Sequence, residues 1–507
     1  MVIGYKLRES SGIKNFFSLG SRSAMQEVLD LVRLRYVDNV KTDSIGSQAI
    51  NNLLHQLDPH SVYIPASDIE YVNDDLRGNF SGIGVEFQIF YDTVNVLNVL
   101  PGGPSEKAGL QVGDKFLKVN DSISIAGKNL KPDDIRKLLR GERGTTVKLT
   151  VLRDNQPISV SIERGNIPVP TVDAAYMINP ETGFIHLNKF GESTYREFMQ
   201  TMEKLQAQKM KKLILDLRGN GGGLLDQAVN IADEFLDEDK LIVYTEGAHT
   251  PKSEYRCKRP GVFETGNLVL LVDEGSASAS EVLIGALQDW DRATIIGRRT
   301  FGKGLVQEQF GLNDGSALRL TVARYYTPLG RNIQKPYADG YDKYETEVSK
   351  RFQDGEVIKG DTTKKTGKSY KTKSGRMVYG GGGITPDVFV SFDTSAMSKE
   401  VMKLYMNELF NNFTYSYFIS HKQYFQQFKT IAELAEKYKA GDPEWNALKA
   451  FSAKDSINLE NIKEKEKAAI LEKIPRSIAR QKWRYEGYFE VMNRTDSFVQ
   501  KALVILK

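Results

Sequence analysis

Three serines lie where an apolar run meets a helix-forming segment, in the stretch LVLLVDEGSASASE from Leu268 to Glu281. A serine at a tight turn between a strand and a helix is exposed, and amides at the helix N-terminus can stabilise an oxyanion. Ser278 and Glu281 also have the spacing of a capping box, so this serine can simply cap the helix expected over 281–289. The stretch alone leaves both interpretations open, because a nucleophilic serine also needs a base.

Histidine is the usual base, and none of the histidines lies in a turn or loop that suggests pairing with the serine. There are five of them: His55, His60, His186, His249 and His421. His60, in LDPHSVYIP, is expected to pack or to make a local hydrogen bond. Lys303 follows a predicted strand over 293–297, and the glycines on either side of it allow a close approach of the backbone. Its amine can act as a base if its pKa is lowered, and a surface lysine in a glycine turn is the alternative.

A third stretch of interest is LILDLRGNGGGLL, in which an apolar run is followed by three glycines, Gly221 to Gly223, directly before a helical segment. Such turns also bind phosphate, but neither the GxGxxG nor the GxxxxGK[ST] spacing is present. The other use of this turn is to present a backbone amide to a developing oxyanion.

Periodicity divides the chain into four regions. Residues 1–77 have a helical apolar pattern, and 78–165 contain short alternating strands punctuated by turn residues. In 166–395, buried apolar runs alternate with helical segments, which predicts an α/β core with a polar, Lys-rich loop at 351–377. Residues 396–507 are helical and highly charged, and they are expected to pack or pair through helices.

Specific elements are expected within these regions. In the first, one helical face carries Val28, Leu31, Val32, Leu34 and Tyr36. In the second, a helix over 132–139 has proline in its first turn and Gly141 just past its end. The expected strands of that region are 94–100, 115–119, 146–152 and 158–162.

Length and composition restrict the function. A chain of 507 residues with 40% hydrophobic and 26% charged residues is a multidomain globular protein, and its net charge of +4 does not indicate nucleic acid. The single cysteine, Cys257, excludes an internal disulfide and a redox pair. No apolar run is long enough to cross a bilayer, although Val2-Ile3-Gly4 resembles the stub of a removed anchor. Contact of the Lys-rich loop with anionic lipid is an alternative to simple solvation.

Taken together, the motifs resemble the carboxyl-terminal processing proteases, a family of serine peptidases with a serine–lysine dyad and an embedded PDZ domain. The resemblance spans roughly 29–392 and does not extend with equal force to the last hundred or so residues. The motifs that carry it follow the family's order: LDPHSVY, SGIGVEF, VLPGGPSEKAGLQVGDKFLKVND, LDLRGNGGG, GSASASE, TFGKGLVQ, YYTPLGRNIQ and GGGGITPDV.

By this resemblance the nucleophile is Ser278, the base is Lys303 and the residue that orients the lysine is Gln307. An ammonium with a pKa of about 10.4 cannot accept a proton at neutral pH, so Lys303 has to be desolvated. Gln307 can accept a hydrogen bond from the amine without adding a charge. The amides of Ala279 and of Gly222, as one of the three glycines, are the expected oxyanion donors.

The resemblance also implies how substrates are selected. Gly82, Ile83, Gly84 and Val85 resemble the carboxylate-binding loop of a PDZ domain, to which a peptide C-terminus adds as a strand. The expected partners are therefore proteins and peptides with free C-termini. No metal or organic cofactor is implied, because the dyad needs neither. The family also implies the bacterial periplasm or cell envelope, and the helical terminal regions leave membrane proximity and a homo-oligomer open.

The expected architecture is thus an α/β protease core with an inserted PDZ-like domain, a helical N-terminal region and a helical C-terminal extension. The main rival is a catalytically silent PDZ-type scaffold, against which stand Ser278, Lys303 and Gln307 together. A second rival, the related tricorn-like peptidases, uses a histidine base, and no suitably placed histidine supports it.

Overall fold

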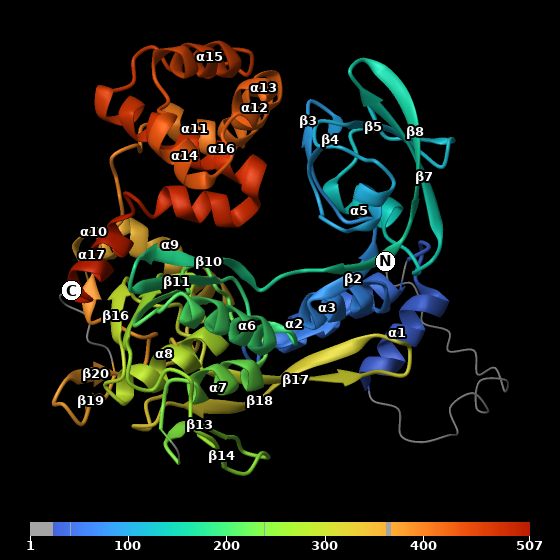
Figure 1. Ribbon diagram of the computed structural model, residues 1–507. Helices are drawn as coiled ribbons and strands as arrows, with labels where there is room; N and C mark the ends of the chain where they lie inside the picture. The colour runs from blue at the N-terminus through green and yellow to red at the C-terminus, as the bar shows by residue number, and fades with distance from the viewer. Residues whose placement is uncertain (1–23, 41, 238, 361–366) are drawn as a thin grey trace, which may run out of the picture.

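The structure is a computed structural model that describes residues 24–40, 42–237, 239–360 and 367–507. The proposed anchor stub at Val2 to Gly4 lies outside the described residues. Figure 1 shows a central body of sheets and helices, with the C-terminal helices and a β-rich region as two further bodies at the top. Among the described helices, none combines the length and the apolarity that a bilayer span requires.

A six-stranded sheet forms the centre of the α/β core, and all of its strands except the first run parallel. Their order in the sheet is β10 (Val172–Asn179), β11 (Thr182–Leu187), β12 (Lys212–Asp216), β15 (Asn267–Val272), β16 (Thr294–Gly297) and β21 (Val388–Phe389). The apolar runs that predicted buried strands form β11, β12, β15 and β16. One face packs on α6 (Thr194–Ala207), α7 (Leu225–Asp233) and α8 (Ala279–Asp289).

The other face of this sheet is covered by the last part of the chain. Phe489 of α16 (Glu464–Met492) and Phe498 and Val499 of α17 (Ser497–Ile505) pack on strand residues such as Ile214. Arg218, at the end of the LDLR run, binds Asp496 at the N-cap of α17 at 2.9 Å. The C-terminal extension therefore completes the protease core.

A second sheet, with antiparallel pairing, lies beside the core and has the order β1, β18, β13 and β14, with β17 on β18. Its strands are β1 (Val62–Ile64), β13 (Leu241–Glu246), β14 (Ser253–Arg256), β17 (Leu305–Gly311) and β18 (Ala317–Tyr326). In the register of β1 with β18, Val62 lies opposite Arg319. The strand β1, which precedes the β-rich region in the chain, is thereby paired with β18, which follows that region.

The PDZ-like region agrees closely with its predicted elements. Its sheet has the order β3 (Val85–Phe90), β4 (Thr93–Val99), β5 (Lys115–Val119), β7 (Thr146–Arg153) and β8 (Gln156–Glu163), with β6 (Ile123–Ser124) on β5. The remaining elements are α4 (Pro104–Lys107), α5 (Pro132–Leu139), β2 (Asn79–Gly82) and β9 (Gly165–Pro168). A separate apolar cluster between Ile83 and Ile162 forms its core. The boundaries proposed at residues 77, 165 and 395 stay a prediction.

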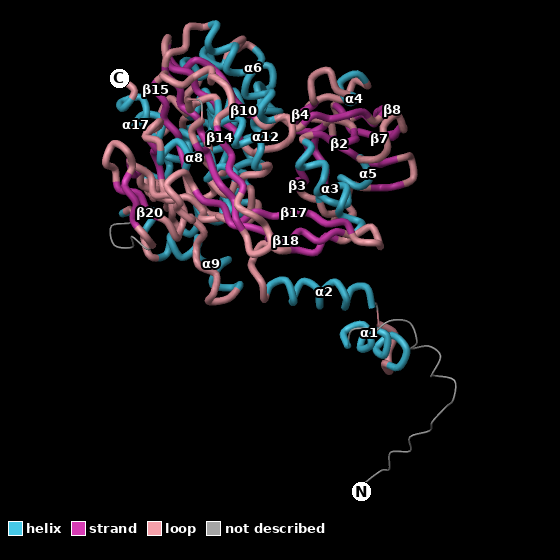
Figure 2. The backbone as a smooth tube through the Cα atoms, turned by 90° about the horizontal axis from the view of Figure 1, so that it is seen from below, coloured by secondary structure: helices cyan, strands magenta, loops and turns pink. Residues whose placement is uncertain are grey.

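The N-terminal helices form as predicted, but the apolar face of the first one is not buried. They are α1 (Ala24–Arg35), α2 (Thr42–His55) and α3 (Ala66–Arg77). The helix α1 has no buried residue, and Leu31 and Leu34 are 48% and 71% exposed. Figure 2 shows α1 and α2 extending away from the rest of the molecule.

The C-terminal helices have their own apolar core and contact the PDZ-like region. Before α16 they are α11 (Lys399–Met406), α12 (Leu409–Ser420), α13 (Lys422–Gln426), α14 (Ile431–Lys437) and α15 (Asp442–Ala453). Tyr415 donates to the carbonyl of Val96 at 3.0 Å. Arg484, at a kink inside α16, pairs with Glu86 of β3 at 2.8 Å.

Our prediction of one solvated loop over 351–377 is wrong at both of its ends. The helix α9 (Tyr341–Gln353) continues to Gln353, α10 (Glu356–Lys359) follows, and β19 (Ser369–Lys371) pairs with β20 (Met377–Tyr379). Arg351 is buried because its guanidinium donates to the carbonyls of Arg299, Thr300 and Phe301. The polar composition of this segment therefore did not reveal that its first residues form the packed end of α9. Residues 361–366 lie outside the described part of the chain.

Candidate active site

The three serines of the SASAS stretch have different surroundings. Ser276 and Ser280 are fully buried, and their hydroxyls donate to the carbonyls of Leu217 and Asn220 at 2.8 and 2.9 Å. Ser278, between them, is only partly buried and lines a cleft. The two outer serines therefore fix the turn, and the middle one faces the space where a substrate can bind.

The backbone of Ser278 is held in an unusual conformation. Its φ of +56° and ψ of −116° lie outside the regions that a residue with a side chain prefers. Ser278 stands between the end of β15 and the start of α8, so the strained turn pushes its side chain outward. Nucleophilic serines in strand-to-helix turns have this type of geometry.

The cleft around Ser278 has a volume of about 490 Å³ and brings together all of the residues predicted for catalysis and for the oxyanion hole. Lys303, just before β17, and Gln307, within β17, lie in the same cleft as Ala279 and Gly222. Apolar side chains form much of the remaining wall: Leu76, Leu224, Leu225, Val282, Leu305 and Val306.

Two buried side chains connect the backbone of Ser278 with that of Lys303. The carboxylate of Glu281 accepts hydrogen bonds from the amide of Ser278 at 3.0 Å and from that of Lys303 at 2.8 Å. The hydroxyl of Tyr325 lies within hydrogen-bond distance of the carbonyls of the same two residues. Burial raises the pKa of Glu281 to about 7. Glu281 is thus more than a helix cap, because it sets the spacing of the proposed nucleophile and base.

The amine of Lys303 is desolvated. Burial, and after it the positive charge of Arg319, lower the pKa of Lys303 to about 8. Its Nζ donates to Oε1 of Gln307 at 2.8 Å, as predicted for an orienting residue without charge. No hydrogen bond joins this Nζ to the hydroxyl of Ser278, both of which belong to the described residues.

The expected oxyanion donors lie beside Ser278. Ala279 is the first residue of α8, and Gly222 lies so close that a Cβ added to it would be 2.8 Å from Cβ of Ser278 and 2.9 Å from the amide nitrogen of Ala279. The amide of Gly222, however, donates to Oδ1 of Asn220 at 2.9 Å. This amide is available to an oxyanion only if that bond is exchanged, and Gly221 and Gly223 line the same cleft on either side of it.

The predicted carboxylate-binding loop lies in the PDZ-like region. Gly82, Ile83, Gly84 and Val85 line a cavity of about 180 Å³ together with residues of α5 and Arg140 just beyond it. The strand that follows the loop, β3, is at the edge of its sheet. An edge strand beside a groove can accept an extended peptide as a further strand.

The other reactive side chains are placed away from such chemistry. No histidine lines the cleft, and the pKa of His60 is lowered to about 3 by burial and by the charge of Lys303. Cys257 is buried, and this raises the pKa of its thiol to about 12. Within the described ranges, no cluster of His, Cys, Asp or Glu is arranged to hold a metal ion.

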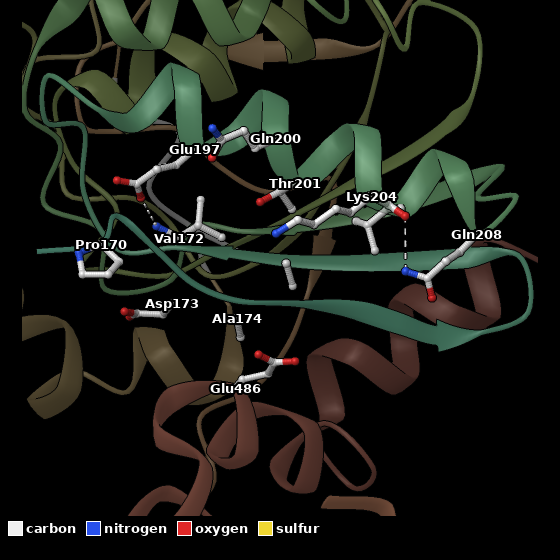
Figure 3. A pocket seen from close by; sticks show the side chains of 12 residues that line it. Pro170, Val172, Asp173, Ala174, Glu197, Gln200, Thr201, Lys204, Gln208 and Glu486 are labelled. Carbon is white, nitrogen blue, oxygen red and sulfur yellow. Dashed lines mark hydrogen bonds between the residues drawn. The ribbon is translucent and has the colours of Figure 1, made fainter. Parts of the chain in front are cut away.

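A second cavity, of about 400 Å³, lies between α6, β10 and α16 (Figure 3). Figure 3 shows Lys204 extending along β10, with Glu486 of α16 on the opposite side. Glu197 accepts a hydrogen bond there from the amide of Val172 at 3.3 Å. None of the residues predicted for catalysis or peptide binding lines this cavity.

Comparison with known proteins shows the family to which the chain belongs. The model of peptidase family S41 matches residues 181–340, and that of the PDZ domain matches 81–163. A carboxy-terminal-processing protease of Bartonella bacilliformis is 35% identical over 314 residues, which are 61% of this chain and 71% of that protein. The chain belongs to the carboxy-terminal-processing protease family. It is therefore a serine-type peptidase with a PDZ domain, and the reading as a silent scaffold is not supported.

Other relatives of this protease have similar coverage. A probable CtpA-like serine protease of Staphylococcus haemolyticus is 36% identical over 338 residues, 66% of each chain. The protease thus spans about two thirds of the length of the curated relatives it matches. A solved photosystem II D1 C-terminal processing protease is 26% identical, with a TM-score of 0.38 over 73% of this chain and 87% of that one.

Sequence reasoning found the residues of the cleft but missed those that hold them. It treated Glu281 only as a cap, did not name Tyr325, and gave His60 no link to the cleft. The carbonyl of His60 in fact accepts a hydrogen bond from Nε2 of Gln307. For Glu281, the sequence signal was a glutamate in the first turn of a helix expected to be buried, where a carboxylate needs hydrogen-bond donors. For Tyr325 and His60, only the pairing of β17 and β1 with β18 reveals the contact.

Proposed function

We propose that this protease cleaves unfolded or C-terminally recognised proteins with Ser278 as nucleophile and Lys303 as general base. The observation that carries the proposal is the pairing, in one cleft, of the one partly exposed serine of the turn with a lysine whose pKa is lowered to about 8. At neutral pH a useful fraction of that amine is unprotonated and can accept a proton. Gln307 orients the amine.

In the first half of the reaction, rotation of the two side chains brings Nζ of Lys303 to the hydroxyl of Ser278. The neutral amine takes the hydroxyl proton while Oγ forms a bond to the substrate carbonyl carbon. The carbonyl electrons move to oxygen, which receives hydrogen bonds from Ala279 and from one of the glycine amides around Gly222. The tetrahedral intermediate then expels the substrate amine, which takes its proton from the Lys303 ammonium.

In the second half, a water molecule attacks the acyl-enzyme ester and gives its proton to Lys303. The ester bond breaks, Oγ of Ser278 takes the proton back, and the new carboxyl terminus leaves. The apolar wall of the cleft, with Leu225 and Val282, favours apolar substrate side chains next to the cleaved bond.

Substrate C-termini bind at the loop Gly82 to Val85, where consecutive amides receive the terminal carboxylate and β3 accepts the peptide as an added strand. The position of this loop at an edge strand supports this part of the proposal. The positive charge of Arg140 beside the cavity adds attraction for an anionic terminus.

The family also supports action in the bacterial periplasm or cell envelope and close to a membrane. Self-association through the terminal helices belongs to the same proposal, and the exposed apolar side chains Leu31 and Leu34 of α1 support it. Light scattering of the protein and of a Leu31→Lys variant tests this point, since a lower mass for the variant is expected.

The decisive experiment is incubation of the purified protein with an unfolded protein that has an apolar C-terminus. We expect fragments from the parent protein and none from the Ser278→Ala variant. We also expect excess chelator to leave the rate unchanged, because the reaction uses no metal. Substantial cleavage by a clean Ser278→Ala preparation would exclude Ser278 as the nucleophile.

A further inference from the structure

The turn from Asp58 to Ser61, in the LDPHSVY motif, is built around one buried carboxylate. Oδ1 of Asp58 accepts hydrogen bonds from the amides of His60 and Ser61 at 2.8 and 2.9 Å, and Oδ2 accepts the hydroxyl of Ser61 at 2.6 Å. Thr321 of β18 also donates its hydroxyl to Oδ1, at 3.1 Å. A carboxylate with this many donors fixes the turn and fastens it to β18.

Thr321, which binds the Asp58 carboxylate, lies directly opposite Gln307, the residue that orients the proposed base. In the pairing of β17 with β18, Thr321 is the partner of Gln307. The side chain of Gln307 also contacts the turn, because its Nε2 donates a hydrogen bond to the carbonyl of His60. A carbonyl can only accept, so the amide of Gln307 must place its oxygen on the other side. That oxygen is the one that accepts from Nζ of Lys303 at 2.8 Å.

The imidazole of His60 begins a second path that returns to the lysine backbone. Its Nε2 lies 2.6 Å from the hydroxyl of Tyr344 on α9, and that hydroxyl also accepts from Nε2 of Gln334 at 3.3 Å. Oε1 of Gln334 accepts from the amide of Gly304 at 2.8 Å. The hydrogen bonds thus form a closed ring that includes both the side chain of Lys303 and the backbone next to it.

The directions of the bonds in this ring are consistent. The amide of Gly304 can only donate, so Gln334 presents its nitrogen to Tyr344, whose proton then points to Nε2 of His60. The imidazole accepts there and is neutral, in agreement with its pKa of about 3. Burial raises the pKa of Tyr344 far above its usual value. Neither ring member changes charge over the range in which Lys303 titrates.

From this arrangement we infer that Asp58, His60 and Tyr344 are positioning residues for the general base. They act through Gln307 and give it one amide orientation, so that the amine of Lys303 is aimed when it accepts the proton of Ser278. This inference rests on the proposed function. It adds a role for an N-terminal segment, which lies outside the region matched to the peptidase family model.

A double-mutant cycle tests the inference because it asks whether Asp58 acts through Gln307. Asp58→Asn, Gln307→Ala and the double variant are compared by kcat on a fluorogenic peptide. We expect Asp58→Asn to lower kcat about tenfold with little change in KM, as for a residue that aims a base. In the Gln307→Ala background, the same substitution should change kcat by less than about twofold.

The ring predicts a second, independent result. His60→Ala removes the imidazole but keeps the carbonyl that Gln307 needs, and Tyr344→Phe removes the hydroxyl that the imidazole binds. Each should lower kcat about threefold, and the double variant should be no worse than either alone, since both break the same link.

Asp314→Asn is the matched control, because Asp314 accepts from the amide and hydroxyl of Ser316 in a similar turn but is exposed. It should leave kcat unchanged. Equal losses from Asp58→Asn in both backgrounds, or no loss in either, would overturn the inference while leaving the dyad intact. Full activity of Gln307→Ala, or cleavage by Ser278→Ala, would instead contradict the proposed function.

Discussion

The proposed catalytic cleft and the PDZ groove would both receive a polypeptide, but they are built in different ways. In the cleft, segments from distant parts of the sequence supply His60, Ser278 and Lys303, and buried side chains connect them. The groove comes from one continuous region, with the loop Gly82 to Val85 and the helix α5 inside residues 81–163. Its binding groups are proposed to be backbone amides, which only a substitution to proline would remove.

This difference determines how sensitive each site is to substitution. A side chain lost from the cleft leaves a buried partner without its hydrogen bond, and such a loss typically costs about 1–3 kcal/mol besides the direct loss of chemistry. A substitution within the loop Gly82 to Val85, other than to proline, crowds or tilts the amides but leaves them present. We therefore expect large losses of rate at the cleft and moderate losses of affinity at the groove, and the following predictions test this contrast.

The largest effect is expected at Lys303. Lys303→Ala should lower kcat by about 10³-fold or more, and combining it with Ser278→Ala should lower it no further, because nucleophile and base act as a unit. Lys303→Arg should be equally inactive, since arginine keeps the charge but does not release its proton. The measurement is cleavage of an unfolded protein, with folding checked by circular dichroism. A partly active Lys303→Arg variant would contradict a lysine base.

The next effect is expected at Tyr325, whose hydroxyl lies between the carbonyls of Ser278 and Lys303. Tyr325→Phe should lower kcat about tenfold or more and lower the free energy of unfolding by about 1–3 kcal/mol, because buried carbonyls lose their donor. Tyr326→Phe, at the next position of β18, is the matched control and should change neither quantity much. Similar losses in both variants would show that β18 as a whole, and not this contact, is sensitive.

At the groove we expect a moderate loss of affinity. A peptide with an amidated C-terminus should bind the Ser278→Ala form about tenfold more weakly than the free acid, because charge-assisted hydrogen bonds are lost. Gly84→Val should weaken the free acid and leave the amidated peptide nearly unchanged. Gly102→Val is the control, since both glycines have positive φ, but an added Cβ contacts Ile167 only at Gly84. Equal affinity for acid and amide would show that the loop does not receive a carboxylate.

The smallest effect is expected from a substitution of Arg319, which lines the catalytic cleft. Activity should rise with pH through about 8, because only neutral Lys303 acts as a base. The positive charge of Arg319 disfavours the ammonium, so Arg319→Gln should raise the pKa of Lys303 and move the profile to higher pH. At pH 7 we expect a loss of about two- to threefold that disappears above pH 10. A profile that moves to lower pH would be contrary to this electrostatic role.

The same contrast explains what the sequence could predict. The helix over 132–139 depends on local capping rules, and it appears where expected. The loop at Gly82 to Val85 was assigned through its resemblance to a PDZ domain, and it lines a cavity beside that helix. Ser278, Lys303 and Gln307 were assigned through a resemblance to a family with known motifs, and the fold brings them into one cleft. Their roles stay a prediction until the variants are measured.

What the sequence could not predict depends on contacts between distant segments. The ring through His60 and Tyr344 needs the pairing of β1 with β18 and the packing of α9, which have no local signature. The sequence predicted which face of α1 is apolar, but periodicity does not show what covers a face, and this face is exposed. Arg351 was assigned to a solvated loop because composition does not show that a charged side chain binds buried carbonyls.

The pairing of β1 with β18 also has a consequence for the order in which the proposed site forms during folding. His60 and Gln307 are 247 residues apart, and the whole PDZ-like region lies between them in the chain. Contacts of such long range form late in folding, because closing the loop between them has a large entropic cost. Until β18 has been synthesised and has paired with β1, the proposed base Lys303 therefore lacks the hydrogen-bonded ring that we infer to orient it.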